Sequence, residues 1–510
     1  MGVDGRQIES SRWLSFTALC TQSMESLKPR SLRELLFAPV DIAFLVFFRV
    51  GFSGIMLWEV YRYFSLGRIK PYYILPEFHF KYYGFEWIEP WPGDGMYWHF
   101  CAMGALAACM LIGFCYRLAA FLFFCAFTFV FLQEQANYLN HFYLVILISL
   151  LMVLLPAHRA WSVDALLRPR LRSQMVPAWS LWLLRAQIGI VYFYGGLAKL
   201  GPDWLRGEPM RSWLAERAGK FPSFGHYFHE EWVVYGFAYG GLLFDLLVVP
   251  LLLWRPTRWL GYLWALSFHL INASLFNIGI FPWFMLCATL IYLPPDFPKR
   301  IWRFLLGAVR RLFKRKGWQP RLAAPQAGFQ GASRSWTTGQ RVLVSFLGLY
   351  LLVQCLVPFR HLLYPGDVNW TEEGHRFSWR MKLRGKDGEA IFKVVQPSTG
   401  KFWEVDPEGN LTGKQVDEMA GRPDMILQFA HHLASAMREK GYGKVEVYVN
   451  AMVSLNGREP ELLIDPKVDL AKVRRSLAHS TWILPLKGEL RASKQKEQAG
   501  RAHHQKTAPE

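Results

Sequence analysis

Two residues in apolar surroundings have the right types for proton chemistry. Lys199 ends the run Tyr192-Phe-Tyr-Gly-Gly-Leu-Ala-Lys199, and His141 follows Asn140 at the start of another apolar segment. An amine in an apolar setting loses the solvation of its charged form, so the neutral amine is favoured and can act as a base. A histidine can donate a hydrogen bond to a developing oxyanion. The simpler interpretations are a lysine that extends its amine to the membrane surface and a histidine that caps a helix.

Five further residues are candidates for contact with a bound cofactor. Gly195 and Gly196 lie one turn before Lys199 and permit close approach of a ligand or a helix. His269 and Asn272 are three residues apart and therefore share one face of a helix, and Asn140 adjoins His141. Two histidines on different helices could also be haem ligands, but no other haem feature accompanies them.

Four charged residues lie within apolar segments: Arg49, Glu59, Arg185 and Asp245. Burying such a charge alone costs several kcal/mol, so we expect these residues to pair with one another, in the simplest case as ion pairs that stabilise the bundle. The sequence has no Walker loop, GxSxG elbow or HExxH motif, and its seven cysteines lack metal-ligand spacing. We therefore expect no nucleotide-driven or hydrolytic chemistry, no disulfide framework and no metal.

The composition is that of a membrane protein. Hydrophobic residues make up 52% of the chain and charged residues 19%, against about 25% charged in average soluble domains. The sequence predicts a membrane α-helical bundle of about nine transmembrane helices, followed by a small α+β soluble domain. The nine predicted segments are about Ile42–Tyr61, Tyr97–Tyr116, Leu118–Phe131, Phe142–Leu155, Leu181–Leu200, Trp232–Trp254, Trp259–Leu275, Ile278–Leu293 and Val342–Val357.

The distribution of charge predicts the topology. The net charge is +19, and the segment Asp296–Gln340 carries ten Lys or Arg and one acid. Basic loops stay in the cytoplasm beside anionic lipid head groups, so we expect membrane lipid as a partner and no nucleic acid. Nine spans from a cytoplasmic N-terminus place the C-terminal domain outside the cytoplasm. The predicted units are a cytoplasmic arm (1–40), a catalytic bundle (41–294), a basic cytoplasmic loop (295–341), a last span (342–358), the extracytoplasmic α+β domain (359–486) and a disordered charged tail (487–510).

The C-terminal domain shows alternating apolar residues and turn signals. One helix is predicted over Pro423–Lys440, and turns are predicted at Lys386-Asp387-Gly388 and Leu455-Asn456-Gly457. The predicted strands are Phe377–Leu383, Ala390–Val395, Val445–Val453 and Glu461–Ile464.

The run Gln187–Trp204 resembles the lysine-bearing helix of vitamin K-dependent γ-glutamyl carboxylases. Ala198 stands where that family often has a second lysine, and the chain lacks the long C-terminal extension of the animal enzymes, so tight propeptide binding and their cysteine cross-link are not expected. Five other stretches are similar to the family in the same order: Asn140–Leu144, Trp161–Leu166, Phe268–Asn272 with Leu275–Gly279, Val357–Leu363 with Asn369-Trp370, and Ile464–Asp469.

The resemblance implies a reaction. Lys199 would deprotonate reduced vitamin K (the hydroquinone or menaquinol), which reacts with O2 to give a strong base and leaves as the 2,3-epoxide. That base would remove a γ-proton from glutamate in a protein or peptide, and the carbanion would capture CO2. His141 would hydrogen-bond the oxygenated intermediate. The substrate glutamate would lie near His361, Asn369 and Trp370.

Two alternatives remain from the sequence. One is a quinol epoxidase or monooxygenase without glutamate carboxylation, for which the same lysine and histidine would serve. The other is a non-enzymatic lipid- or quinone-binding membrane protein or carrier, in which changing Lys199 to Ala would leave function intact.

Overall fold

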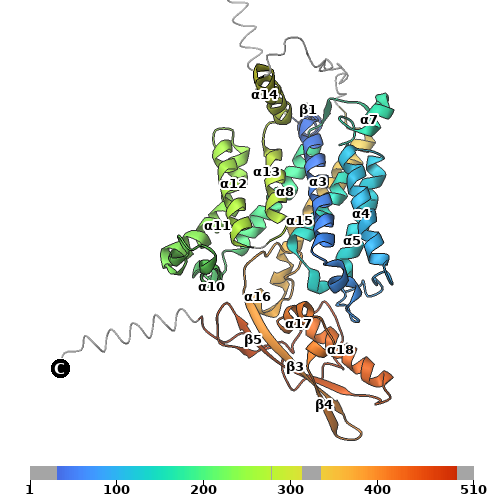
Figure 1. Ribbon diagram of the computed structural model, residues 1–510, viewed down its shortest axis with the longest axis vertical. Helices are drawn as coiled ribbons and strands as arrows, with labels where there is room; N and C mark the ends of the chain where they lie inside the picture. The colour runs from blue at the N-terminus through green and yellow to red at the C-terminus, as the bar shows by residue number, and fades with distance from the viewer. Residues whose placement is uncertain (1–30, 277, 313–334, 491–510) are drawn as a thin grey trace, which may run out of the picture.

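The computed structural model describes residues 31–276, 278–312 and 335–490, so most of the predicted tail (487–510) and most of the predicted N-terminal arm (1–40) lie outside the described residues. A helical bundle forms one end of the molecule and a domain built on a β-sheet forms the other (Figure 1). The main bundle helices are α3 (Ala43–Ser65), α4 (Gly95–Ile112), α5 (Tyr116–Gln133), α6 (Asn140–Leu154), α8 (Trp179–Ala198), α11 (Glu231–Leu253), α12 (Arg258–Leu275), α13 (Phe281–Thr289) and α15 (Thr338–Leu356).

Each of the nine predicted segments lies mainly in one of these helices. Six helices among the described residues are long and apolar enough to cross a membrane: α3, α4, α5, α8, α11 and α15 with its 3₁₀ extension to Leu363. Helix α6 has 15 residues and α13 has nine. At about 1.5 Å per residue, neither covers the roughly 30 Å of a hydrocarbon core. The count of nine spans is therefore not confirmed.

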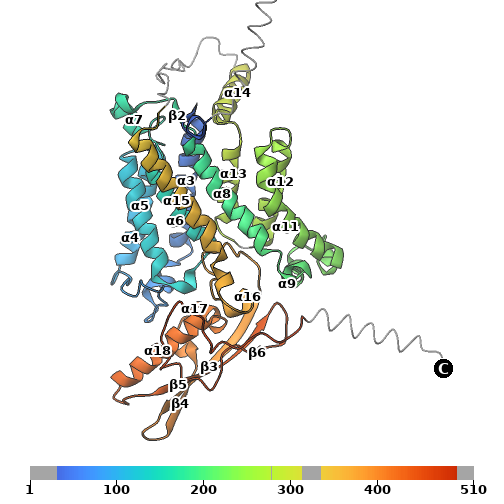
Figure 2. The same ribbon diagram turned by 180° about the vertical axis from the view of Figure 1, so that it is seen from behind.

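The bundle buries a core rich in aromatic rings. Phe52 of α3 packs against Phe123 of α5 and Phe284 of α13, with ring centroids 6.5 and 5.9 Å apart. Helix α15 runs along the back of the bundle toward the sheet domain (Figure 2). Short elements connect the bundle: α2 (Leu32–Phe37), α7 (Val163–Leu167), α9 (Pro202–Leu205), α10 (Met210–Arg217) and the antiparallel strands β1 (Pro39–Asp41) and β2 (Met175–Pro177).

The prediction that the four intramembrane charges pair with one another is wrong. The Arg49 guanidinium donates to backbone carbonyls of the loop after α6, including Ala157 O at 2.7 Å. Arg185 donates to carbonyls of the 3₁₀ turn that follows α13, including Ile291 O at 3.0 Å. Glu59 pairs with Arg62 at 2.6 Å, and Asp245 pairs with Lys199. Backbone carbonyls of the segments that follow α6 and α13 satisfy the two arginines, and sequence patterns do not reveal such partners.

The C-terminal domain is a four-stranded antiparallel sheet, in the order β4-β3-β5-β6, packed against α17 (Gly413–Ala420) and α18 (Pro423–Glu439). Its strands are β3 (Lys386–Gln396), β4 (Lys401–Val405), β5 (Glu446–Leu455) and β6 (Glu461–Leu462). Three predicted strands and the predicted helix are confirmed, as is the turn at Asn456-Gly457, where both residues have positive φ.

Three details of that prediction are wrong. Phe377–Leu383 is an irregular segment, not a strand, because Phe377 and Trp379 pack against Tyr143 of the bundle and produce the alternation. The expected turn at Lys386-Asp387-Gly388 begins β3, where Gly388 pairs with Val453. Strand β4 was not predicted.

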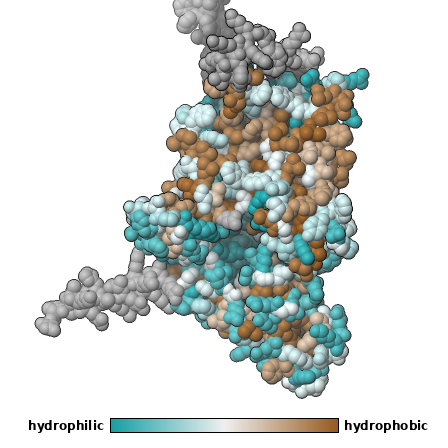
Figure 3. Space-filling view, in the orientation of Figure 1, coloured by the Kyte–Doolittle hydropathy of each residue, from teal (hydrophilic) through white to brown (hydrophobic). Residues whose placement is uncertain are grey.

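The predicted basic loop contains helix α14 (Phe297–Leu312), which lies at the end of the bundle opposite the sheet domain (Figure 1). The surface is largely apolar over the bundle and more polar over the sheet domain (Figure 3). These features describe a membrane-type helical fold with an extramembrane C-terminal region.

Candidate active site

A cavity of about 520 Å³ opens between the bundle and the start of the sheet domain. Its walls are mostly apolar and aromatic, and a few polar side chains converge on it, as in typical sites for small organic ligands. The polar lining includes Asn140, His141, Tyr192, Lys199, Asp245, His269, Asn272 and Lys382.

Lys199 caps the C-terminal end of α8 and points its amine into the protein. Only 7% of the residue is exposed. Its Nζ lies 2.5 Å from Asp245 Oδ2 and 3.2 Å from Gly195 O, and it sits 5.3 Å from the Trp204 ring centroid. The amine therefore does not extend to the membrane surface; a carboxylate and an aromatic face hold it inside the cavity wall.

Gly195 and Gly196 allow Asp245 to reach Lys199. A Cβ on Gly196 would lie 2.7 Å from Leu246 Cδ2, and a Cβ on Gly195 would lie 3.2 Å from Asp245 Oδ2. Neither glycine is part of the cavity lining. These glycines bring α8 and α11 close together, and their contact with a cofactor stays a prediction.

His141 comes from a different helix and lines the same cavity. It is the second residue of α6, is 8% exposed, and lies against the ring of Phe281 at 5.7 Å. Within the described ranges, its ring nitrogens have no hydrogen-bond partner, so both remain available to a ligand. The adjacent Asn140 amide donates to Arg380 O at 3.2 Å, which ties the start of α6 to the C-terminal region.

His269 is held by a chain of hydroxyl groups. Its Nε2 lies 2.8 Å from Tyr192 Oη, Tyr192 Oη lies 3.1 Å from Thr289 Oγ1, and the Thr289 hydroxyl donates to Met285 O. Because the Thr289 hydroxyl donates its hydrogen to Met285 O, it accepts the hydrogen of Tyr192 Oη–H. Tyr192 Oη can then accept from His269 Nε2–H, which satisfies all three contacts. Asn272, one turn later, donates to Phe268 O at 2.9 Å and also lines the cavity.

The segment Phe377–Lys382 reaches from the C-terminal region into the cavity wall. Phe377, Trp379 and Lys382 all have positive φ, between 49° and 65°. Such backbone conformations are uncommon outside glycine and persist only where the surroundings impose them. Met381 extends to α8, where its Cε would lie 3.6 Å from a Cβ on Gly195.

Two family models match the chain. The model described as HTTM domain matches residues 37–297, slightly more than half of the chain. The model described as vitamin K-dependent gamma-carboxylase, lumenal domain, matches residues 339–489. The chain belongs to the vitamin K-dependent γ-carboxylase family. With its apolar helices, this member of the family is a membrane protein with a lumenal domain. No solved structure matches the chain.

The three residues predicted to lie near the substrate glutamate line neither this cavity nor the polar cleft beside Arg360. His361 Nδ1 contacts Pro358 O at 2.8 Å, and Trp370 is buried with its Nε1–H donating to Leu484 O at 2.7 Å. Asn369 accepts a bond of 3.3 Å from Arg380. In this chain these residues form the joint between the bundle and the lumenal domain.

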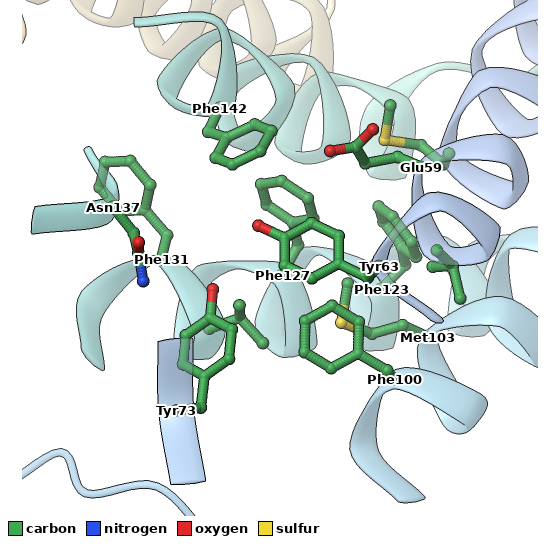
Figure 4. A pocket seen from close by; sticks show the side chains of 13 residues that line it. Glu59, Tyr63, Tyr73, Phe100, Met103, Phe123, Phe127, Phe131, Asn137 and Phe142 are labelled. Carbon is green, nitrogen blue, oxygen red and sulfur yellow. The ribbon is translucent and has the colours of Figure 1, made fainter. Parts of the chain in front are cut away.

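A second, smaller cavity is lined by Phe142, the neighbour of His141 in sequence (Figure 4). Phenylalanine and methionine side chains surround it, with Glu59, Tyr63, Tyr73 and Asn137 at its edges (Figure 4). Its volume of about 20 Å³ holds little more than one water molecule. It is too small for a quinone.

Sequence reasoning missed the partners of Lys199. Asp245 was noted as an intramembrane charge, but no spacing rule links residues 46 positions apart on separate helices. The signal that could have found the pair is chemical: an unpaired carboxylate within an apolar helix requires a cation, and Lys199 ends another apolar helix. No comparable signal in the sequence points to Trp204, Met381 or Lys382 as residues of the site.

Proposed function

We propose that the protein is a membrane γ-glutamyl carboxylase that couples epoxidation of reduced vitamin K by O2 to carboxylation of peptide glutamate by CO2. The main support for this proposal is that Lys199 and His141, from separate helices, face one cavity large enough for a quinone. Family membership supports the use of reduced vitamin K and a glutamate-containing protein substrate.

The cavity suits a flat, largely apolar quinol. Trp204, Phe268 and Phe281 supply aromatic surface, and the polar groups gather at Lys199–Asp245 and at His141. Trp232 and Ile271 line the cavity and are also exposed on the bundle, which gives a lipid-borne quinol a route of entry. When bound, reduced vitamin K would supply, on reaction with O2, the strong base that the γ-carbon of glutamate requires.

Lys199 and Asp245 would act together as the initial base. A proton shared over the 2.5 Å contact can move from the amine to the carboxylate without changing the net charge of the site. Proton transfer within the pair avoids the cost of an unpaired charge in an apolar cavity. The neutral amine of Lys199 then accepts a proton from the bound quinol.

His141 would stabilise negative charge that develops on oxygen during the reaction. A free N–H that is already oriented in a water-poor cavity stabilises developing negative charge more strongly than the same donor does in water. Asn140 supports it by fixing the start of α6 on the Arg380 carbonyl. The ring of His269, held by Tyr192, and the amide of Asn272 would bind the quinol on the opposite wall.

We also propose nine membrane crossings, in which α6, α12 and α13 join the six helices that are long and apolar enough to cross. The N-terminus and the basic loop 295–341 would be cytoplasmic, and residues 359–486 would form the lumenal or periplasmic domain. A cysteine-free chain carrying Ser398→Cys or Arg315→Cys tests this topology. We expect an impermeant thiol reagent to label the first only from the lumenal side and the second only from the cytoplasmic side.

The decisive experiment supplies purified protein with reduced vitamin K, O2, labelled bicarbonate and a glutamate-containing peptide. We expect label in the peptide and epoxide in the lipid fraction. Epoxide alone would indicate a quinol epoxidase, and neither product would indicate a binding protein. Lys199→Ala should abolish epoxide formation, with partial recovery at high pH or with an added small amine; full turnover in that variant would contradict the assignment.

A further inference from the structure

Lys382 is a second cation in the wall of the cavity that contains Lys199. Its Nζ lies 5.2 Å from the ring centroid of Trp213 and 5.8 Å from that of Phe276. Those two rings meet edge to face, with centroids 5.8 Å apart. The ammonium is thus held against two aromatic faces, an arrangement that fixes its position without neutralising its charge.

Lys382 has no carboxylate within ion-pair distance among the residues that the structure describes. Burial is the largest influence in lowering the pKa of Lys382 below its usual range, and the charges of Arg217, Glu216 and Glu418 have smaller effects. By surface area the side chain is nevertheless exposed. Both observations fit a residue whose open surface faces the cavity. By contrast, Lys199 in the same cavity has its own carboxylate.

The backbone of Lys382 is positioned from two sides. Its φ of 49° lies in the left-handed region, which a lysine adopts only under constraint. On one side Met381 packs at α8 beside Asp245. On the other, Gly385 N–H donates to Asn456 Oδ1 at 2.9 Å, and the Asn456 amide donates to Asp203 at 2.7 Å. The strained segment therefore presents one unpaired ammonium at the lumenal side of the cavity.

We propose that Lys382 binds the γ-carboxylate of the substrate glutamate and thereby selects glutamate over glutamine. The inference rests on the proposed function, since a glutamyl side chain is the anionic substrate that enters this cavity from the lumenal domain. An ammonium with no internal partner recognises a carboxylate by charge, whereas a neutral amide offers it only a weaker dipole.

The test measures binding and does not require turnover. Peptides that differ only in one central residue, glutamate or glutamine, are titrated into purified protein in detergent, for the unaltered chain, Lys382→Met and Lys382→Arg. A charge-assisted hydrogen bond corresponds to roughly a ten-fold or greater difference in Kd. We expect the unaltered chain to prefer the glutamate peptide by about that factor, Lys382→Met to lose the preference, and Lys382→Arg to retain part of it.

Two control variants separate this inference from the proposed function. Lys393→Met removes another lysine that stacks on an aromatic ring, 4.7 Å from the Phe402 centroid on the outer sheet, and should leave the preference unchanged. Lys199→Ala should abolish turnover yet retain the preference. The inference is wrong if the unaltered chain binds both peptides equally, or if Lys382→Met still prefers the glutamate peptide. Either result counts whether or not the protein carboxylates peptides.

Discussion

Asp203 and Arg458 form a bidentate ion pair that joins the bundle to the lumenal domain. Arg458 Nη1 and Nη2 lie 2.7 and 2.8 Å from the two carboxylate oxygens of Asp203, and both side chains are about nine-tenths buried. Asp203 follows Lys199 by four residues, so this pair anchors the turn that carries the proposed base. The lumenal domain thereby contributes to the geometry of a site that lies in the bundle.

Arg458→Ala should destabilise the protein and slow both reactions. Removing one partner of a buried pair leaves an uncompensated charge, which costs about 3–5 kcal/mol. The measurement is the unfolding midpoint in detergent together with the rate of epoxide formation. Arg300→Ala breaks an exposed pair with Asp296 and serves as the control, with little expected change in the unfolding midpoint. Equal effects of the two variants would show that the buried pair has no special role.

Asp245→Asn should lower the rate of epoxide formation by about 10²–10⁴-fold, because the amide keeps the shape of the carboxyl group but cannot take the proton from Lys199. Initial rates in reconstituted vesicles, normalised to folded protein, provide the measurement. Glu59→Gln is the matched control, since Glu59 is a carboxylate of the bundle that pairs with Arg62 and does not line the large cavity. An Asp245→Asn variant as fast as this control would remove Asp245 from the mechanism.

His141→Ala should reduce turnover by about 10²–10³-fold while the bundle stays folded, because the variant loses one hydrogen-bond donor to developing charge. Turnover and the unfolding midpoint are measured side by side, with the exposed His226→Ala as control. A large loss of stability with unchanged turnover per folded molecule would instead make His141 a structural residue.

The lumenal domain should lose stability as the pH falls below about 6.5. Burial and the guanidinium groups of Arg384 and Arg380 hold the pKa of His375 well below its usual range, so the folded protein keeps this ring neutral. The unfolded chain protonates the same ring below about pH 6.5. Acidification therefore favours the unfolded state, by about 1.4 kcal/mol for each pH unit below that value.

His375→Gln should weaken this acid dependence, since its side chain does not titrate. Unfolding midpoints at pH 7.5 and 5.5 compare the variant with the unaltered chain. His431→Gln is the control, because His431 is a partly exposed histidine whose Nε2 lies 2.8 Å from Val473 O. An identical loss of stability on acidification in all three proteins would exclude His375 as the titrating group.

The sequence alone determined the helical bundle, the lumenal α+β domain, the family and the two residues at the centre of the proposed site. Each follows from local pattern: apolar runs predict helices, alternation predicts strands, and Lys199 and His141 stand out because polar groups in apolar runs are costly. Reliance on local pattern also explains why the strand predicted at Phe377–Leu383 is wrong. The alternation of apolar residues there arose from packing against Tyr143.

Only the tertiary structure decided which charges meet and which residues face the cavity. Asp245 reaches Lys199 because two glycines let α8 and α11 approach, Asp203 meets Arg458 across 255 positions of sequence, and Lys382 enters the cavity on a strained backbone. Local patterns fix the faces of helices and strands. The relations between those faces depend on how side chains of distant segments fill a shared volume, which no short-range pattern encodes.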